Sequence, residues 1–494
     1  MQRISVDGVP VRWSQGPAPL SATLTFGCGA RDETFRTLGV THLIEHLAMS
    51  TVPRLHHEHN ASVDLEATRF TASGTPEQVA AFLEAVCVAL SGLPLDRMEH
   101  EAGVLTAEAA SPTHPGAAFP LHQRYGHRGP GLAPCTGPGY DRLTPEAVSR
   151  HAASYFTRGN AVLQLTGPVP DHLRLPLPGG NRPRRTAPEA RPGPSWDDAP
   201  IDGAALALAA PADSPAAALG HALLAHRLTG LARHQRGLSY AVEGDTVLRD
   251  HLTKDTLIWL DARPGHEEEV AALLWNETLR LAQEPVTDFE IKDEIEGFRE
   301  AYEDPRAIEA ELDLAARADL FGLPHRDSAD RLRALRAVTT EEIRSHFARA
   351  LGSALLTVPV GTRPHLTGVD GAPLERRGCW RRGDLPAGET FRPPLLARAA
   401  YRGARAARLV LTPAGIVERD ADGDLHEILF DQVVGMERDG DDRTLFGALG
   451  CIIAVSAGLY SGVGRLVAAL DAAVPAEVAY DVSALRDLGQ DTPG

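Results

Sequence analysis

The stretch THLIEHLAMS at residues 41–50 places two histidines, His42 and His46, around a glutamate, Glu45. Threonine is a favourable N-cap, and the residues that follow favour a helix, so we expect a helix that begins at Thr41. On a helix, the two histidines and the glutamate fall at positions i, i+3 and i+4 and share one face. The apolar residues between them point elsewhere and are expected to anchor the helix in a core: Leu43, Ile44 and Leu47.

Two imidazoles one helical turn apart can bind a single zinc ion, with Glu45 beside them as a base. A catalytic zinc usually takes three protein ligands and keeps one position for water, so a third ligand is needed. The segment DRMEHEAGVLTAEAASP at 96–112 offers Glu101 and Glu108, two helical turns apart on one side of a helix. Without such a third ligand, a helix that carries two histidines by chance would remain the alternative.

The order of these features is H-x-x-E-H, a strand region, an amphipathic helix and then E-x6-E. It resembles the insulinase (pitrilysin) family of zinc metallopeptidases, the inverzincins, which includes the mitochondrial processing peptidases. The resemblance implies a Zn²⁺ ion held by His42, His46 and Glu108. It also implies that Glu45 is the general base and that Glu101 is an outer carboxylate that orients the site.

The resemblance extends over both halves of the chain, to about residue 370. The lead-in FGCGARDETFRTLGVTHLIEH (26–46) and the strand segment HNASVDLEATRFTASG (59–74) are similar to those of the family. In the second half, RHQRGLSYAVEGD (233–245) carries an arginine and, seven residues on, a tyrosine. The family's second domain uses such a pair to reach the substrate at the zinc, which implies this role for Arg233 and Tyr240.

Two features near the motif qualify this interpretation. The stretch from His46 to Glu108 is about one helix shorter than is usual in the family, which leaves substrate preference undecided but not the metal. The run of residues 56–59, His-His-Glu-His, looks metal-binding, but consecutive residues do not converge on one ion in a strand or a helix. We expect it to be a loop or surface run.

Two proline-rich stretches, 168–200 and 384–398, divide the chain, because proline breaks helices and central strands. They delimit an N-terminal peptidase domain with the zinc site (1–175), a second homologous domain with the Arg/Tyr pair (195–370) and a small β-rich module (399–485).

The first two regions look like copies of one another. LTPEAVSRHAASYFTRGNAVLQLTGPV (143–169) parallels VTTEEIRSHFARALGSALLTVPVG (338–361). Each has a threonine before an acidic first turn, a short helix that passes His151 or His346, and then an apolar strand. Strands followed by long helices, such as those at 286–318, in repeated halves predict a duplicated α+β fold of α/β layers.

The third region has the pattern of short strands, with a hairpin turn at Asp422 and Gly423. Its last segment spaces apolar residues along one helical face: Leu466, Val467, Leu470 and Val474. Strands capped by one C-terminal helix resemble a pleckstrin-homology module by topology alone. A structural appendage and a docking module for a dedicated partner both remain open.

Composition limits the remaining possibilities. The chain of 494 residues has a formal net charge of -17, which argues against nucleic-acid binding. The five cysteines form no C-x-x-C pair, which suits a reducing compartment better than a disulfide framework. The N-terminus has no apolar core of signal-peptide type, and the one long uncharged run, 444–464, is only marginally long enough for a membrane span. We therefore expect a cytoplasmic protein with no membrane partner.

The sequence thus predicts a zinc metalloendopeptidase that hydrolyses extended or unfolded peptides. Turnover of degraded peptides and processing of one precursor peptide both fit. The resemblance implies two chains around a chamber. Because this chain carries both the zinc half and the Arg/Tyr half, we favour a homodimer over a heterodimer with a related subunit. The alternative is a non-catalytic member of the same fold that serves as a structural or peptide-holding subunit.

Overall fold

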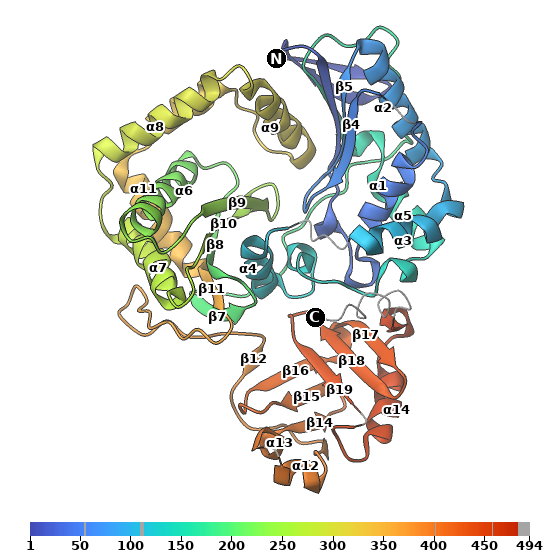
Figure 1. Ribbon diagram of the computed structural model, residues 1–494, viewed down its shortest axis with the longest axis vertical. Coiled ribbons are helices and arrows are strands. Elements are labelled where there is room, and N and C mark those ends of the chain that lie inside the picture. Colours follow the sequence, from blue (N-terminus) through green and yellow to red (C-terminus); the bar gives the residue numbers. More distant parts are fainter. Residues whose placement is uncertain (54–55, 109–112, 401, 457, 483–494) are drawn as a thin grey trace.

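The computed structural model describes residues 1–53, 56–108, 113–400, 402–456 and 458–482. Residues 109–112, at the end of the predicted Glu101/Glu108 segment, and 483–485, at the end of the predicted third region, lie outside the described residues. Figure 1 shows an N-terminal part in blue to teal, a second part in green to yellow and a β-rich part in orange to red.

The N-terminal part is built on a six-stranded sheet with the order β1-β2-β6-β3-β5-β4. Its strands are β1 (Gln2–Val6), β2 (Val9–Trp13), β3 (Leu20–Phe26), β4 (Glu58–Val63), β5 (Thr68–Gly74) and β6 (Ala161–Leu165). Helix α1 (Val40–Met49) contacts the three helices α2 (Pro76–Ser91), α3 (Met98–Glu108) and α5 (Pro145–Tyr155). One core joins sheet and helices, and Leu43, Ile44 and Leu47 of α1 are fully buried in it, as predicted.

The second part has a five-stranded sheet with the order β7-β11-β8-β10-β9. Its strands are β7 (Ser195–Ala199), β8 (Gly203–Pro211), β9 (Val242–Leu248), β10 (Thr253–Asp261) and β11 (Leu355–Pro359). Its helices are α6 (Pro215–Leu228), α7 (Glu267–Gln283), α8 (Asp288–Glu303), α9 (Ala307–Phe321), α10 (Ser328–Arg336) and α11 (Thr340–Ala350). The proline-rich stretch 168–200 contributes only β7, at the edge of the sheet, where proline is tolerated nearby.

Five strands of the first sheet have the topology of the second sheet, with β1 as an additional edge strand, which confirms the predicted duplication. In each, a strand pairs in parallel with the last strand of its half, β2 with β6 and β7 with β11. The last strand of each half pairs antiparallel with a central strand, β6 with β3 and β11 with β8. Two further antiparallel strands follow in each sheet, β5 and β4 in the first and β10 and β9 in the second. The helices before the last strands, α5 and α11, begin at the capping threonines Thr144 and Thr339. His151 and His346 occupy corresponding helices.

One helix of each half also packs against the sheet of the other half. Helix α4 (Pro115–Tyr125), from the N-terminal half, contacts β8, β10 and β11 of the second sheet. There Leu121 and Tyr125 are buried with Trp259 in a shared cluster, and a Cβ on Gly116 would lie 2.4 Å from the Trp259 ring. In return, α9 of the second half contacts β6 and β2, and Arg12 pairs with Asp319 at 2.7 Å. Figure 1 shows α4 beside the second sheet and α9 beside the first.

The β-rich part contains two sheets, with the orders β12-β16-β15-β14-β13 and β19-β18-β17-β20. The strands are β12 (Trp380–Arg381), β13 (Glu389–Phe391), β14 (Arg408–Leu411), β15 (Gly415–Arg419), β16 (Leu425–Leu429), β17 (Val433–Asp439), β18 (Asp442–Gly447), β19 (Ile452–Val455) and β20 (Ala479–Asp481). Short helices α12 (Leu395–Ala400) and α13 (Arg402–Ala406) precede β14.

Three predictions for this part can be compared with its structure. The hairpin turn is confirmed, because β15 and β16 pair antiparallel around Gly423, whose φ is +89°. Helix α14 (Val463–Ala473) buries Leu466 and Leu470 in the core of this part, as predicted. The expectation that this helix ends the fold is wrong, because β20 follows it and pairs in parallel with β17.

The 444–464 run is not one continuous apolar element, because β18, β19 and the start of α14 divide it. Among the described residues, none of the helices alone has both the length and the apolar composition needed to cross a membrane. One pair of neighbouring helices, Pro76–Ser91 and Leu95–Glu108, passes that test jointly but is bent by 84° at its break.

Candidate metal centre

The helix that carries the motif begins differently from the prediction. Its N-cap is Gly39, with φ of +86°, rather than Thr41, which is buried in the first turn. The carboxylate of Glu33 accepts hydrogen bonds from the backbone N–H groups of Gly39 at 2.7 Å and Thr41 at 2.9 Å. An N-cap threonine side chain is therefore unnecessary, and Thr41 Oγ1 instead lies 3.0 Å from His151 Nε2.

The three motif side chains converge. Glu45 Oε2 lies 3.6 Å from His42 Nε2 and 3.9 Å from His46 Nε2. The two imidazole rings meet edge to face, with their centroids 4.9 Å apart. Helical spacing alone explains this arrangement, because all three side chains leave one face of α1 while the opposite face fills the core.

Helix α3 brings the two predicted carboxylates to this cluster. Glu108 Oε2 lies 3.7 Å from His46 Nε2 and 4.0 Å from His42 Nε2. Glu101 Oε2 lies 3.6 Å from His46 Nδ1, and its other oxygen, Oε1, pairs with Arg97 at 3.0 Å. Glu108 therefore faces the same ring nitrogens as Glu45, whereas Glu101 faces the opposite nitrogen of one histidine.

These residues fit a zinc ion. One ligand atom from each of His42, His46 and Glu108 lies within 4.8 Å of the others. Tetrahedral zinc with bonds of about 2.0–2.1 Å needs its ligand atoms about 3.3 Å apart, so a shift of under about 1 Å brings Glu108 into place. Burial, and then the neighbouring His46, lower the pKa of His42, which keeps its imidazole neutral and its lone pair available.

The environment of Glu45 is that of a proton carrier. Burial, and then the charges of Glu108 and Glu101, raise the pKa of Glu45 to about 8. The carboxyl therefore holds a proton at neutral pH. A cation between the histidines and Glu108 would favour the carboxylate, so the group is poised to exchange a proton near neutrality.

The predicted substrate-contacting pair, Arg233 and Tyr240, lies on the segment after α6. Arg233 belongs to the π-helix η7 (Thr229–Gln235), and its guanidinium carbon lies 5.0 Å from the centre of the Tyr240 ring. The backbone N–H of Tyr240 donates to Asp261, and its side chain is 75% exposed. Among the described residues, no hydrogen bond or ion pair links this pair to the metal centre. Their substrate-contacting role stays a prediction.

Structure adds neighbours that the sequence did not reveal. The Tyr140 ring lies 6.5 Å from the His42 ring, between centroids, and burial raises its pKa to about 12. Nothing in the sequence around Tyr140 marks it, because the residue lies far along the chain from the motif. The run of residues 56–59, expected to be a loop or surface run, exposes His56 and Glu58, but its last two residues belong to β4. In the described part of the chain these four residues belong to none of the groups of converging ligand atoms.

No protein-family model and no curated protein matches this chain in sequence. Several solved structures match it in fold. An inactive M16 peptidase domain from Pseudomonas fluorescens gives a TM-score of 0.59 at 16% identity, over 74% of this chain and 98% of that one. The first half of the periplasmic protease PqqL from Escherichia coli gives 0.53 at 14% identity, over 73% and 92%.

A chain of Complex III from Candida albicans is similar to the same degree, with a TM-score of 0.58 at 14% identity over 72% of this chain and 95% of that one. The chain therefore has the M16 peptidase fold, the insulinase/pitrilysin fold that the sequence predicted. These neighbours include both proteases and an inactive domain, so the fold does not decide between catalysis and a structural role.

Proposed function

We propose that this protein is a zinc-dependent endopeptidase that hydrolyses extended or unfolded peptides. The observation that carries the proposal is the convergence of His42, His46 and Glu108 around one point, with Glu45 alongside. A structural subunit has no need for two histidines whose ring nitrogens lie 3.6–4.0 Å from the carboxylates of a third ligand and a base. The M16 fold supports a peptide as the substrate.

The chain's residues divide the work of hydrolysis. A bound zinc ion would supply Lewis acidity, which polarises a peptide carbonyl and lowers the pKa of water. Glu45 would accept the proton of the attacking water and then pass it to the departing amine, first as general base and then as general acid. Glu101 would accept a hydrogen from His46 Nδ1 and so hold the ring in the orientation in which Nε2 faces the metal.

The second half would hold the substrate. Tyr240 would donate a hydrogen bond to the carbonyl oxygen as negative charge develops there, and Arg233 would bind the peptide backbone or a carboxylate. Stacking of the guanidinium on the Tyr240 ring supports a joint role, because each side chain limits the orientations of the other. We further propose a homodimer, since one chain carries both parts of the site.

The Glu45→Gln variant tests the assignment of the base. We expect it to keep zinc at the wild-type level and to lose peptide hydrolysis by about 10²-fold or more, because an amide cannot take up the proton. Zinc is measured by elemental analysis and turnover with a quenched fluorescent peptide library. The exposed Glu99, on α3, provides the matched control Glu99→Gln, which should match wild type in both assays.

The same assays decide the alternative, a non-catalytic member that holds peptides, which the inactive M16 neighbour favours. Zinc that remains unchanged in Glu108→Gln would remove Glu108 as a ligand. A wild-type protein that binds peptides but, when loaded with zinc, cleaves none of the library would establish the non-catalytic role.

A further inference from the structure

A second group of potential ligands lies in the β-rich part, away from the motif. Cys379 precedes β12, His426 lies on β16, and Cys451 precedes β19. One ligand atom of each lies within 4.8 Å of the others. These three positions come from the linker into this part and from each of its two sheets, so the chain has brought together residues that are far apart in sequence.

The geometry is close to that of a metal site. His426 Nδ1 lies 3.7 Å from Cys379 Sγ and 3.9 Å from Cys451 Sγ. In tetrahedral zinc, with Zn–S of about 2.3 Å and Zn–N of about 2.0–2.1 Å, sulfur and nitrogen lie about 3.5 Å apart. An inward shift of a few tenths of an ångström would suffice for both pairs.

The second ring nitrogen of the histidine has the partner that a metal ligand needs. His426 Nε2 lies 3.4 Å from Asp420 Oδ2. A carboxylate only accepts hydrogen bonds, so Nε2 carries the hydrogen and Nδ1 faces the two sulfurs. Asp420 is itself held in place, because its Oδ1 accepts the backbone N–H groups of Asp422 and Asp424, both at 2.9 Å. Carboxylate-supported histidines of this kind are typical of zinc sites.

The two cysteines are also in direct contact, because Cys451 Sγ lies 2.9 Å from the Cys379 carbonyl oxygen. The Cys451 thiol donates to that carbonyl, so a bound metal would have to take the place of its proton.

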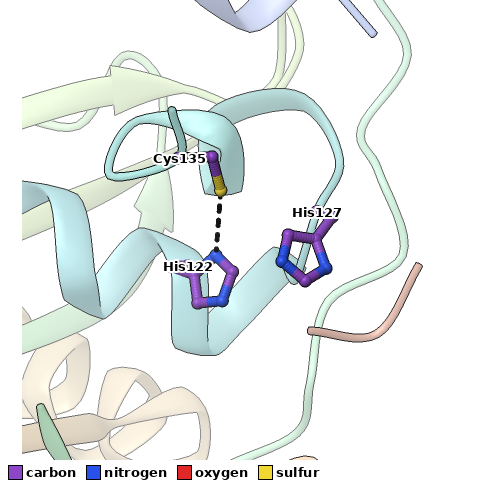
Figure 2. Close-up of side chains that lie close together, drawn as sticks. All are labelled: His122, His127 and Cys135. Carbon is purple, nitrogen blue, oxygen red and sulfur yellow. Dashed lines mark hydrogen bonds between the residues drawn. The ribbon is translucent and has the colours of Figure 1, made fainter. Parts of the chain in front are cut away.

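A comparable cluster in the N-terminal half lacks this arrangement. Figure 2 shows His122, His127 and Cys135 close together, with Cys135 Sγ 3.8 Å from His122 Nδ1. That nitrogen lies 2.8 Å from the Gly131 carbonyl oxygen, and His127 Nδ1 lies 2.8 Å from that of Gly447. Both imidazoles therefore donate from Nδ1 to backbone and keep their Nε2 lone pairs, but the single sulfur of this cluster lies beside the protonated nitrogen of His122. Cys135→Ser therefore serves as a matched single-cysteine control.

We propose that Cys379, His426 and Cys451 form a second, structural zinc site that joins the linker to both sheets of the β-rich part. Two cysteine sulfurs and an imidazole are ligands that zinc prefers, and a water would fill the fourth position of the tetrahedron. The site is independent of the motif on α1 and of any peptidase activity.

Cobalt distinguishes the two sites in the full-length protein. Co²⁺ bound by thiolate gives a near-ultraviolet charge-transfer band, which His42, His46 and Glu108 cannot produce because they contain no sulfur. Metal-free, reduced protein titrated with Co²⁺ should develop this band and saturate at about one thiolate-bound ion per chain. Cys379→Ser and Cys451→Ser should each abolish it, and Cys135→Ser should leave it unchanged.

The His426→Gln variant keeps both sulfurs and therefore separates loss of metal binding from misfolding. It should weaken cobalt binding at least tenfold, while its far-ultraviolet circular dichroism without metal matches that of wild type. Absence of the band in wild type, or its survival in Cys379→Ser, would overturn the proposal. So would a Cys379–Cys451 disulfide found by mass spectrometry in protein purified without reductant, which would identify a redox pair instead.

Discussion

At the scale of single residues, the candidate metal centre combines the predicted ligand residues with neighbours that the sequence did not reveal. Both carboxylates of the E-x6-E segment reach the histidines, because a spacing of seven returns to one side of a helix. Glu33 and Tyr140 could not be foreseen. Their roles depend on a turn before α1 and on a loop close to His42 in space, and no residue pattern encodes those approaches.

The outer carboxylate provides a prediction at this scale. Glu101→Gln should lower zinc affinity by about 10- to 100-fold, because an amide is a weaker acceptor for the His46 ring hydrogen. Competition with a fluorescent chelator measures the affinity, and Glu99→Gln on the same helix is the control. An unchanged affinity in Glu101→Gln would show that the 3.6 Å contact with His46 does not orient the ring.

At the scale of elements, the sequence predicted the repeated halves because helix caps and apolar strands are local signals. Thr144 and Thr339 each cap a helix that precedes the last strand of a half. The start of α1 was mispredicted for a related reason. Threonine is a good N-cap on average, but here the Glu33 carboxylate already accepts the N–H groups of the first turn.

Removal of that carboxylate should therefore destabilise α1. We expect Glu33→Ala to lower the free energy of unfolding by about 1–2 kcal/mol, the usual effect of losing a helix cap. Urea denaturation followed by circular dichroism measures this change, with Glu99→Ala as a surface control. A Thr41→Ser variant, which keeps a hydroxyl, should be far less affected; equal losses in the two variants would restore Thr41 as the important residue.

The corresponding histidines of the two halves predict a pH dependence. Burial lowers the pKa of both His151 and His346 to about 4, against about 6.5 in an unfolded chain. Between these values the unfolded state binds more protons, so stability is full above about pH 6.5 and is lost as the pH falls toward 4. Each histidine contributes on the order of 3 kcal/mol to this loss by pH 4.

Thermal unfolding of wild type and His346→Gln at pH 7.0, 6.0 and 5.0 tests this. The variant should be less stable at pH 7 but should lose less stability on acidification. Parallel pH profiles for the two proteins would show that other groups cause the acid sensitivity.

At the scale of the whole molecule, the exchange of α4 and α9 binds the two halves together. The sequence could not predict it. The segment PGAAFPLHQRY, with prolines and small residues, looks like a loop, and its partners on β8 and β10 lie far along the chain. The exchange depends on the positions of both sheets in the folded chain.

Leu121→Ala should therefore destabilise the pair of halves. Leu121 is fully buried against the second sheet, so we expect a loss of about 2–4 kcal/mol, as is usual for a core leucine. The control is Val88→Ala, since Val88 is 56% exposed on α2. Calorimetry should show one transition for wild type. A variant that loses stability in only one of two separate transitions would show that the halves unfold independently.

The exchanged helices also bear on how the chain is made. As the N-terminal half leaves the ribosome, the apolar face of α4 has no sheet to cover, because β11, at Leu355–Pro359, has yet to be translated. The nascent N-terminal half therefore exposes an apolar surface until most of the polypeptide has been synthesised. Each half should aggregate when it is expressed alone, and the two halves should remain soluble when they are expressed together. A chaperone should also bind this protein early in its synthesis.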